Sequence, residues 1–166
     1  MTPDDASLSV ASENYTIRTL PPQPVMSIRG WTTAAELSQA IGERLPAIWR
    51  YVREIGGMIA GPPFTRYHAI QGDRVDLEAG LPVRSTLPAR GDIRPGELPG
   101  GDAAVATHVG PYEGLPATGA ALAKWVAARG RTAAGPNWEL YVVDPGAEPN
   151  PAKWCTEIIK PLTKSG

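Results

Sequence analysis

The segment Gly61-Pro62-Pro63-Phe64-Thr65-Arg66-Tyr67 has a near copy in Gly135-Pro136-Asn137-Trp138-Glu139-Leu140-Tyr141. Both follow the pattern Gly-Pro-x-aromatic-x-x-Tyr, at a constant offset of 135 − 61 = 74 residues. Each copy comes after a helical pattern with a closing glycine and opens an extended segment. Proline suits the first position of a strand because it fixes φ and needs no ladder partner there. Four matching positions in the same context predict a duplicated chain.

The same order of elements surrounds both copies. In the first half, hydrophobic periodicity predicts an interrupted strand over 15–29, a helix over 33–55 and strands over 64–70 and 75–83. Thr33 and Glu36 have capping-box spacing, while Gly42 and Pro46 predict a kink or a broken first half of the helix. In the second half, the pattern predicts a strand over 103–109, a helix over 115–126 and strands over 137–143 and 154–160.

The predicted fold class is therefore α+β: a tandem duplication of a strand–helix–strand–strand unit with pseudo-twofold symmetry and a central ligand groove. Residues 1–14 are small and polar and are expected to form a flexible tail. A single domain is expected over 15–163, with a first repeat at about 15–90 and a second at about 102–163. The stretch 91–101 is rich in glycine and proline and is expected to be a linker loop.

Composition excludes several kinds of partner. The 16 basic and 17 acidic side chains are scattered, which argues against nucleic acid. No apolar run approaches the roughly 20 residues that cross a membrane. The acidic start and the lone Cys155 favour the cytoplasm. His68 and His108 lie far apart and no phosphate-binding loop is present, so neither a metal nor a cofactor is expected.

Alternation along the second Gly-Pro strand predicts two different faces. Trp138, Leu140 and Val142 are expected to pack under the helix, and the face that carries Glu139 and Tyr141 is expected to look into the groove. The repeat-mate of Glu139 is Thr65, which has no charge. The groove is thus expected to be chemically asymmetric.

With these motifs, the sequence over about 15–162 resembles the GyrI-like effector-binding domains. The resemblance is carried by Trp138-Glu139-Leu140-Tyr141 before Asp144-Pro145, by Thr156-Glu157-Ile158-x-x-Pro161, and by His108-Val109-Gly110-Pro111-Tyr112. It implies that Glu139 faces an aromatic pocket and pairs with lipophilic cations. Because only about 14 residues precede the first strand, the chain is expected to be a stand-alone member without a DNA-binding domain.

The resemblance implies that Glu139 binds the ligand. Four aromatic residues are added as candidate ligand-binding residues because of their positions: Tyr141 on the same strand face, Tyr112 before the second helix, Tyr67 as the repeat-mate of Tyr141, and Trp31 at the edge of the first helix. From the residues alone, Glu139 can instead be a solvated residue of the strand face, or one that is ion-paired with a nearby Arg66 or His68. The tyrosines can be ordinary packing residues. Trp49 and Trp125 lie within the helical patterns and are expected in the core, and Cys155 is read as a small buried residue.

Three functions are compatible with this reading. The first is binding of a small lipophilic, planar or cationic molecule, with relatives in multidrug sensing. The second, permitted by the resemblance, is a hydrolase that opens the cyclopropane of DNA-alkylating natural products and gives antibiotic self-resistance. In it, Glu139 is the general base, and Tyr112 or Tyr141 hydrogen-bonds the substrate carbonyl. The third is a protein-binding module that caps a partner such as gyrase.

Overall fold

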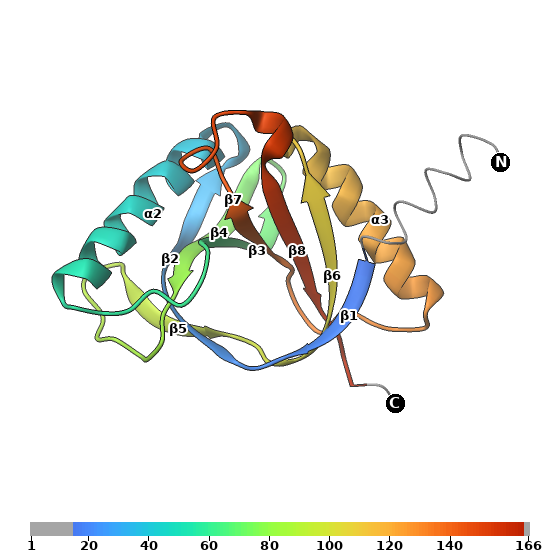
Figure 1. The fold of residues 1–166 in the computed structure, drawn as a ribbon, viewed down its shortest axis with the longest axis horizontal. Helices are drawn as coiled ribbons and strands as arrows, with labels where there is room; N and C mark the ends of the chain where they lie inside the picture. The colour runs from blue at the N-terminus through green and yellow to red at the C-terminus, as the bar shows by residue number, and fades with distance from the viewer. Residues whose placement is uncertain (1–14, 165–166) are drawn as a thin grey trace.

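A computed structural model describes residues 15–164, so the predicted tail, 1–14, lies outside the described residues. Within them, eight strands form one antiparallel sheet that curls between two helices (Figure 1). Its order is β1-β6-β8-β7-β3-β4-β2-β5. The strands are β1 (Tyr15–Leu20), β2 (Gln23–Thr33), β3 (Phe64–Gln71), β4 (Arg74–Pro82), β5 (Arg94–Leu98), β6 (Gly101–Val109), β7 (Trp138–Val143) and β8 (Cys155–Pro161). The α+β class is confirmed.

The two main helices are α2 (Leu37–Glu54) and α3 (Leu115–Ala128), and each follows a short 3-10 turn, η1 (Ala34–Glu36) or η2 (Tyr112–Gly114). A third such turn, η3 (Pro151–Lys153), precedes β8. As the capping-box spacing predicts, Thr33 Oγ1 accepts a hydrogen bond from the amide of Glu36 at 3.2 Å. The described helices include none that is long and apolar enough to cross a membrane.

Helix α2 is one helix through Pro46, so the predicted break does not occur. Proline at this position leaves the carbonyl of Gly42 without its helical donor. Gly42 and Pro46 are both exposed, so water can satisfy that carbonyl and the helix continues.

Two predictions about the strands are wrong. The expected single strand over 15–29 is two strands, because β1 pairs with β6 of the second half while β2 pairs with β4 and β5. The expected linker over 91–101 contains β5, which ends the sheet beside β2. Pro95 and Gly96 lie in this edge strand, where only one side of the backbone needs a ladder partner.

Apolar side chains form three clusters. One lies between α2 and the sheet and contains Met26, Ile48, Tyr51, Val52, Leu81, Val83 and Ile93. The second lies between α3 and the sheet and contains Ala104, Ala106, Leu115, Leu122, Val126, Ile158 and Leu162. The third, here called the concave core, lies on the other face and contains Val25, Phe64, Leu98, Ala103, Val105, Trp138 and Ile159.

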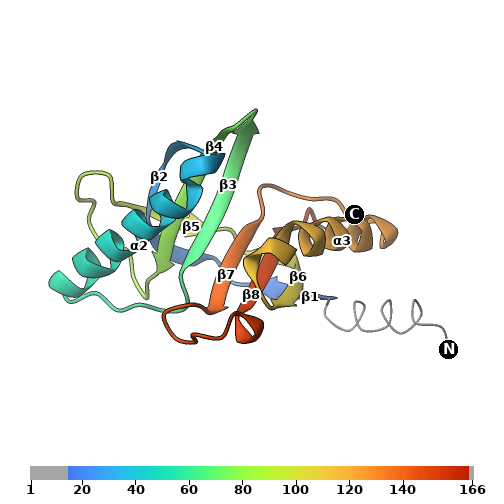
Figure 2. The same ribbon diagram turned by 90° about the horizontal axis from the view of Figure 1, so that it is seen from above.

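The centre of the sheet is a short seam between β3 and β7. Only three residue pairs form it, with Thr65 opposite Glu139, flanked by Phe64 opposite Leu140 and Arg66 opposite Trp138. Helix α2 packs on β2 and β4, and α3 packs on β6. Seen from above, the two helices therefore lie on either side of the central strands (Figure 2). The seam is left between them.

Candidate functional site

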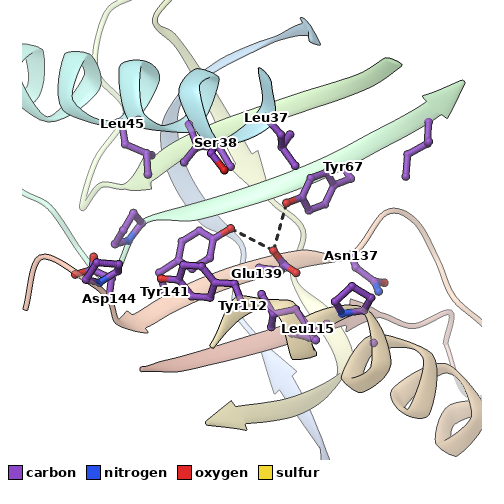
Figure 3. A pocket seen from close by; sticks show the side chains of 18 residues that line it. Leu37, Ser38, Leu45, Tyr67, Tyr112, Leu115, Asn137, Glu139, Tyr141 and Asp144 are labelled. Atoms are coloured by element: carbon purple, nitrogen blue, oxygen red, sulfur yellow. Dashed lines mark hydrogen bonds between the residues drawn. The ribbon is translucent and has the colours of Figure 1, made fainter. Parts of the chain in front are cut away.

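A cavity of about 730 Å³ lies over the seam, between α2 and α3 (Figure 3). Leucine, isoleucine and proline side chains from both helices and the strands give it mostly apolar walls. Its lining residues are Leu37, Ser38, Ile41, Gly42, Leu45, Pro63, Tyr67, Ile70, Tyr112, Leu115, Pro116, Gly119, Asn137, Glu139, Tyr141, Asp144, Pro145 and Ile158.

This position corrects the prediction about the faces of β7. The alternation is as expected, but Trp138 belongs to the concave core, and Leu140 packs against that core, away from the helices. Glu139 and Tyr141 are on the helix side of the sheet, where the cavity is. The reason is that each helix covers only its own half. The open space on the helix side is over the middle strands, and the opposite side is filled by the curl of the sheet.

Glu139 is at the middle of the cavity floor, and three hydroxyl groups surround one oxygen of its carboxylate. The phenol of Tyr141 donates to Oε1 at 3.2 Å and that of Tyr67 at 3.4 Å, with Thr65 Oγ1 at 3.5 Å. Thr65 is fully buried, and its hydroxyl is 2.6 Å from the Tyr141 oxygen. Within residues 15–164, no hydrogen bond reaches the second oxygen, Oε2. It is therefore available to a ligand.

Burial sets the ionisation of this cluster. It raises the pKa of Glu139 above the ordinary glutamate range, and the hydrogen bonds from Tyr141, Tyr67 and Thr65 offset part of the rise. Burial, together with the adjacent Glu139 carboxylate, raises the pKa of Tyr67 to about 12. The pKa of Tyr141 is also raised, first by burial and then by Tyr67 and Glu139. Both phenols therefore stay neutral hydrogen-bond donors at physiological pH.

Tyr112 forms an aromatic wall of the cavity. Its ring centroid is 5.6 Å from that of Tyr141 and 4.9 Å from that of Trp154. The indole of Trp154 is fixed in turn, because its Nε1 donates to the carbonyl of Glu148 at 2.7 Å. The sequence does not assign this role to Trp154. An aromatic residue at the start of a strand is too common a feature to indicate a contact with a loop.

His108 holds the segment that carries Tyr112. Its Nε2 is 2.8 Å from the Pro111 carbonyl, which can only accept, so this nitrogen is the donor. Its Nδ1 is 2.9 Å from Thr118 Oγ1 on α3. A Cβ on Gly114 would come within 2.6 Å of the ring, so glycine is required for this approach. The motif around His108 contributed to the family resemblance, but its positioning role was missed.

The structure brings together four of the five predicted ligand-binding residues: Glu139, Tyr141, Tyr112 and Tyr67. Trp31 is not among the lining residues. It lies on β2 with 41% of its surface exposed, and the Arg74 guanidinium is 5.0 Å from its ring. Asp144 lines the cavity and was not predicted as a site residue. Its place in a turn after β7 indicated a loop, with no sign of its direction.

The alternative ion pairs of Glu139 do not form. Arg66 lies over the ring of Trp138 at 5.2 Å, and His68 Nε2 is 2.7 Å from Glu78 Oε1. Both therefore have partners away from the cavity.

The position of Trp49 differs from the expectation. Trp49 was expected in the core but is 47% exposed, with Arg53 at 4.7 Å from its ring. The helical pattern placed it one step away from the buried stripe of Ile48 and Val52. Among residues 15–164, no group of three His, Cys, Asp or Glu side chains is arranged to hold a metal ion.

Comparison with solved structures shows the same fold in several proteins. EcmrR, in a complex with DNA, is 24% identical with a TM-score of 0.82; the match covers 98% of this chain and 64% of EcmrR. A hydrolase from Listeria innocua is 13% identical with a TM-score of 0.66, covering 96% of this chain and 97% of that one. SAV2435, solved bound to tetraphenylphosphonium, is 13% identical with a TM-score of 0.59, covering 90% and 94%.

Sequence comparison identifies the family. No curated protein sequence matches the chain significantly. The GyrI-like small molecule binding domain matches residues 13–163, nearly the whole chain and all the elements that build the cavity. The chain belongs to the GyrI-like small molecule binding domain family.

Proposed function

We propose that the cavity binds a lipophilic organic cation, with Glu139 as its counter-charge. The observation that carries this proposal is a carboxylate on the floor of a mostly apolar cavity, with one oxygen free of protein partners. Among the lining residues that the structure describes, the two charged side chains, Glu139 and Asp144, are both acidic. A bound cation would thus meet attraction and no like charge.

The aromatic rings favour the same ligand class. A cation over the face of a tyrosine ring gains about 0.5 to 2 kcal/mol, more when water is excluded. Tyr67, Tyr112 and Tyr141 supply three such rings around Glu139. A flat, apolar body would fill the space between Leu37, Leu45 and Leu115. SAV2435, which has the same fold, was solved bound to tetraphenylphosphonium, a lipophilic cation with a bulkier, tetrahedral shape.

We also infer that the groove is on a pseudo-twofold axis produced by duplication. The repeat-mates Thr65 and Glu139 are directly opposite each other in the seam. The strand order β6-β8-β7 in one half mirrors β2-β4-β3 in the other. Superposing residues 25–83 on 104–162 tests this inference, and a poor fit of the two helices would contradict it.

Replacing Glu139 with glutamine is expected to weaken tetraphenylphosphonium binding by about 30-fold, or about 2 kcal/mol. The substitution removes the charge and nearly keeps the volume. Binding of triphenylphosphine oxide, a neutral compound with three of the four phenyl groups, should change much less. Isothermal titration calorimetry measures both.

Glu148→Gln is the matched control. This substitution makes the same change of charge in the loop after β7, at a residue that is not among the lining residues. The amide oxygen of the new glutamine can still accept from the Asn150 amide. It should bind both compounds as the native protein does. Equal losses for cation and neutral compound in Glu139→Gln would show that Glu139 is not the cation's partner.

A second candidate function is hydrolysis, favoured by the raised pKa of Glu139 and the phenols beside it. A carboxylate with a raised pKa is a better general base for activating water, and a phenol can hydrogen-bond a substrate carbonyl. If the protein opens cyclopropane-bearing alkylating agents, Glu139→Gln should still bind them but turn them over at least about tenfold more slowly. Mass spectrometry detects the water adduct. An unchanged compound after prolonged incubation with native protein would contradict this function.

A further inference from the structure

We propose that Asp144 is a second anionic subsite of the same cavity, so that its preferred ligands are elongated dications with an apolar aromatic body between two cationic groups. This inference rests on the proposed binding of cations at Glu139 and extends it to the shape and charge of the ligand.

The backbone sets an upper limit on the separation of Glu139 and Asp144. Glu139 lies near the start of β7, whereas Asp144 follows its last residue, Val143. Five residues of strand at about 3.3 Å each place the two Cα atoms up to about 16 Å apart. Both side chains line the cavity, so the two charges belong to one space rather than to separate surfaces.

Aromatic rings occupy the interval between the carboxylates. Figure 3 shows Tyr141 and Tyr112 between Glu139 and Asp144, with ring centroids 5.6 Å apart. The pKa of Tyr112 is raised by burial first, and then by the charges of Asp144 and Glu139. The charges of both carboxylates therefore act on the same phenol. A ligand lying along these rings would have one end at each acid.

Asp144 is held in place by its own turn. Its Oδ1 accepts from the amides of Gly146 at 3.0 Å and Ala147 at 3.1 Å. In the part of the chain that the structure describes, no hydrogen bond reaches Oδ2. The carboxylate thus resembles that of Glu139: one oxygen is fixed by the protein and the other is free.

This arrangement makes a conservative variant available. In Asp144→Asn, the amide oxygen can still accept from Gly146 and Ala147, so the turn is kept while the charge is removed. Glu148→Gln makes the same change of charge four residues further on, in a side chain that is not among the lining residues. Any effect specific to Asp144→Asn therefore reports on the cavity.

The experiment uses 1,ω-bis(quinolinium)alkanes with linkers of increasing length, each matched with an N-alkylquinolinium monocation of the same chain length. Calorimetry measures binding to the native protein, Asp144→Asn, Glu148→Gln and Glu139→Gln. At the best linker length, the dication should bind the native protein about five- to tenfold more tightly than its monocation, which is the effect of one half-exposed charge pair. Asp144→Asn should lose this gain and bind the monocation normally, and Glu148→Gln should keep it.

Each other outcome has a definite meaning. A dication advantage that persists in Asp144→Asn, or that appears at no linker length, overturns the second subsite and leaves the first intact. An equal loss for monocation and dication in Asp144→Asn also overturns it, since that would be a general charge effect. Monocations that fail to bind, or that bind Glu139→Gln as well as the native protein, overturn the proposed function itself.

Discussion

Phe64→Ala is expected to lower the free energy of unfolding by about 3–5 kcal/mol, the range for removal of a buried aromatic ring. Phe64 is fully buried in the concave core. Its ring is so close to Gly80 that a Cβ there would come within 2.8 Å of it. Such a tight site has little freedom to collapse around the space left behind. Urea denaturation followed by tryptophan fluorescence measures the loss.

Phe64→Leu serves as the graded control and should lose much less, because leucine keeps part of the buried apolar surface. Phe64 also neighbours Thr65, so its removal should displace the floor of the cavity. The folded fraction of Phe64→Ala should therefore bind tetraphenylphosphonium more weakly. A loss of stability below about 1 kcal/mol would mean that the concave core does not hold the seam together.

Tetraphenylphosphonium binding is expected to weaken as pH falls through the raised pKa of Glu139. The cation has no group that titrates, so the change comes from the protein. The pKa of Glu139 is raised by burial, hence the carboxylate is charged above that raised value and neutral below it. Affinity should fall about tenfold for each pH unit below it. The decline should level off when the charge contribution, about 30-fold in total, has been lost.

Calorimetry between pH 8 and pH 4 measures this profile. Glu139→Gln is the control, and its affinity should be low and nearly constant over the same range. The neutral triphenylphosphine oxide should show no such decline with the native protein. A native profile as flat as that of Glu139→Gln would mean that the cation is held by ring faces alone.

Part of the fold was predictable from the repeated sequence motif. The Gly-Pro-x-aromatic-x-x-Tyr pattern marks the start of both central strands, and its phase correctly places Phe64 and Trp138 on one face and Thr65 and Glu139 on the other. What alternation cannot reveal is which face meets a helix. That depends on how far each helix reaches across the sheet, which is a property of the assembled molecule.

The edges of the sheet were predicted least well. Glycine and proline in β5 (Arg94–Leu98) are typical of loops, and only the pairing with β2 makes the segment a strand. Similarly, β1 follows the alternation of an ordinary strand, but its partner β6 is about 85 residues away. The local sequence pattern identifies an extended segment, whereas long-range packing determines which strand it pairs with.

The site was predicted from its motif residues and missed where loops contribute. Glu139 and Tyr141 lie in a strand whose periodicity fixes their direction. Asp144, Trp154 and His108 act through turns around β6, β7 and β8, whose paths follow from hydrogen bonds such as that of the Trp154 indole. Trp31 resembled a ligand-contacting aromatic residue because of its position before a helix, but it stacks with Arg74 instead.

The shortness of the seam has a mechanical consequence. Strands β3 and β7 are joined by three residue pairs, whereas β2 and β4 are joined by nine. A short ladder opposes bending with few hydrogen bonds. The seam can therefore act as a hinge between the half of the sheet that carries α2 and the half that carries α3. We expect the two halves to rotate slightly about this hinge while the concave core holds them together. The width of the cavity would then depend on the angle between the two halves of the sheet. One protein could close around ligands of different thickness without rearranging the side chains that line the cavity.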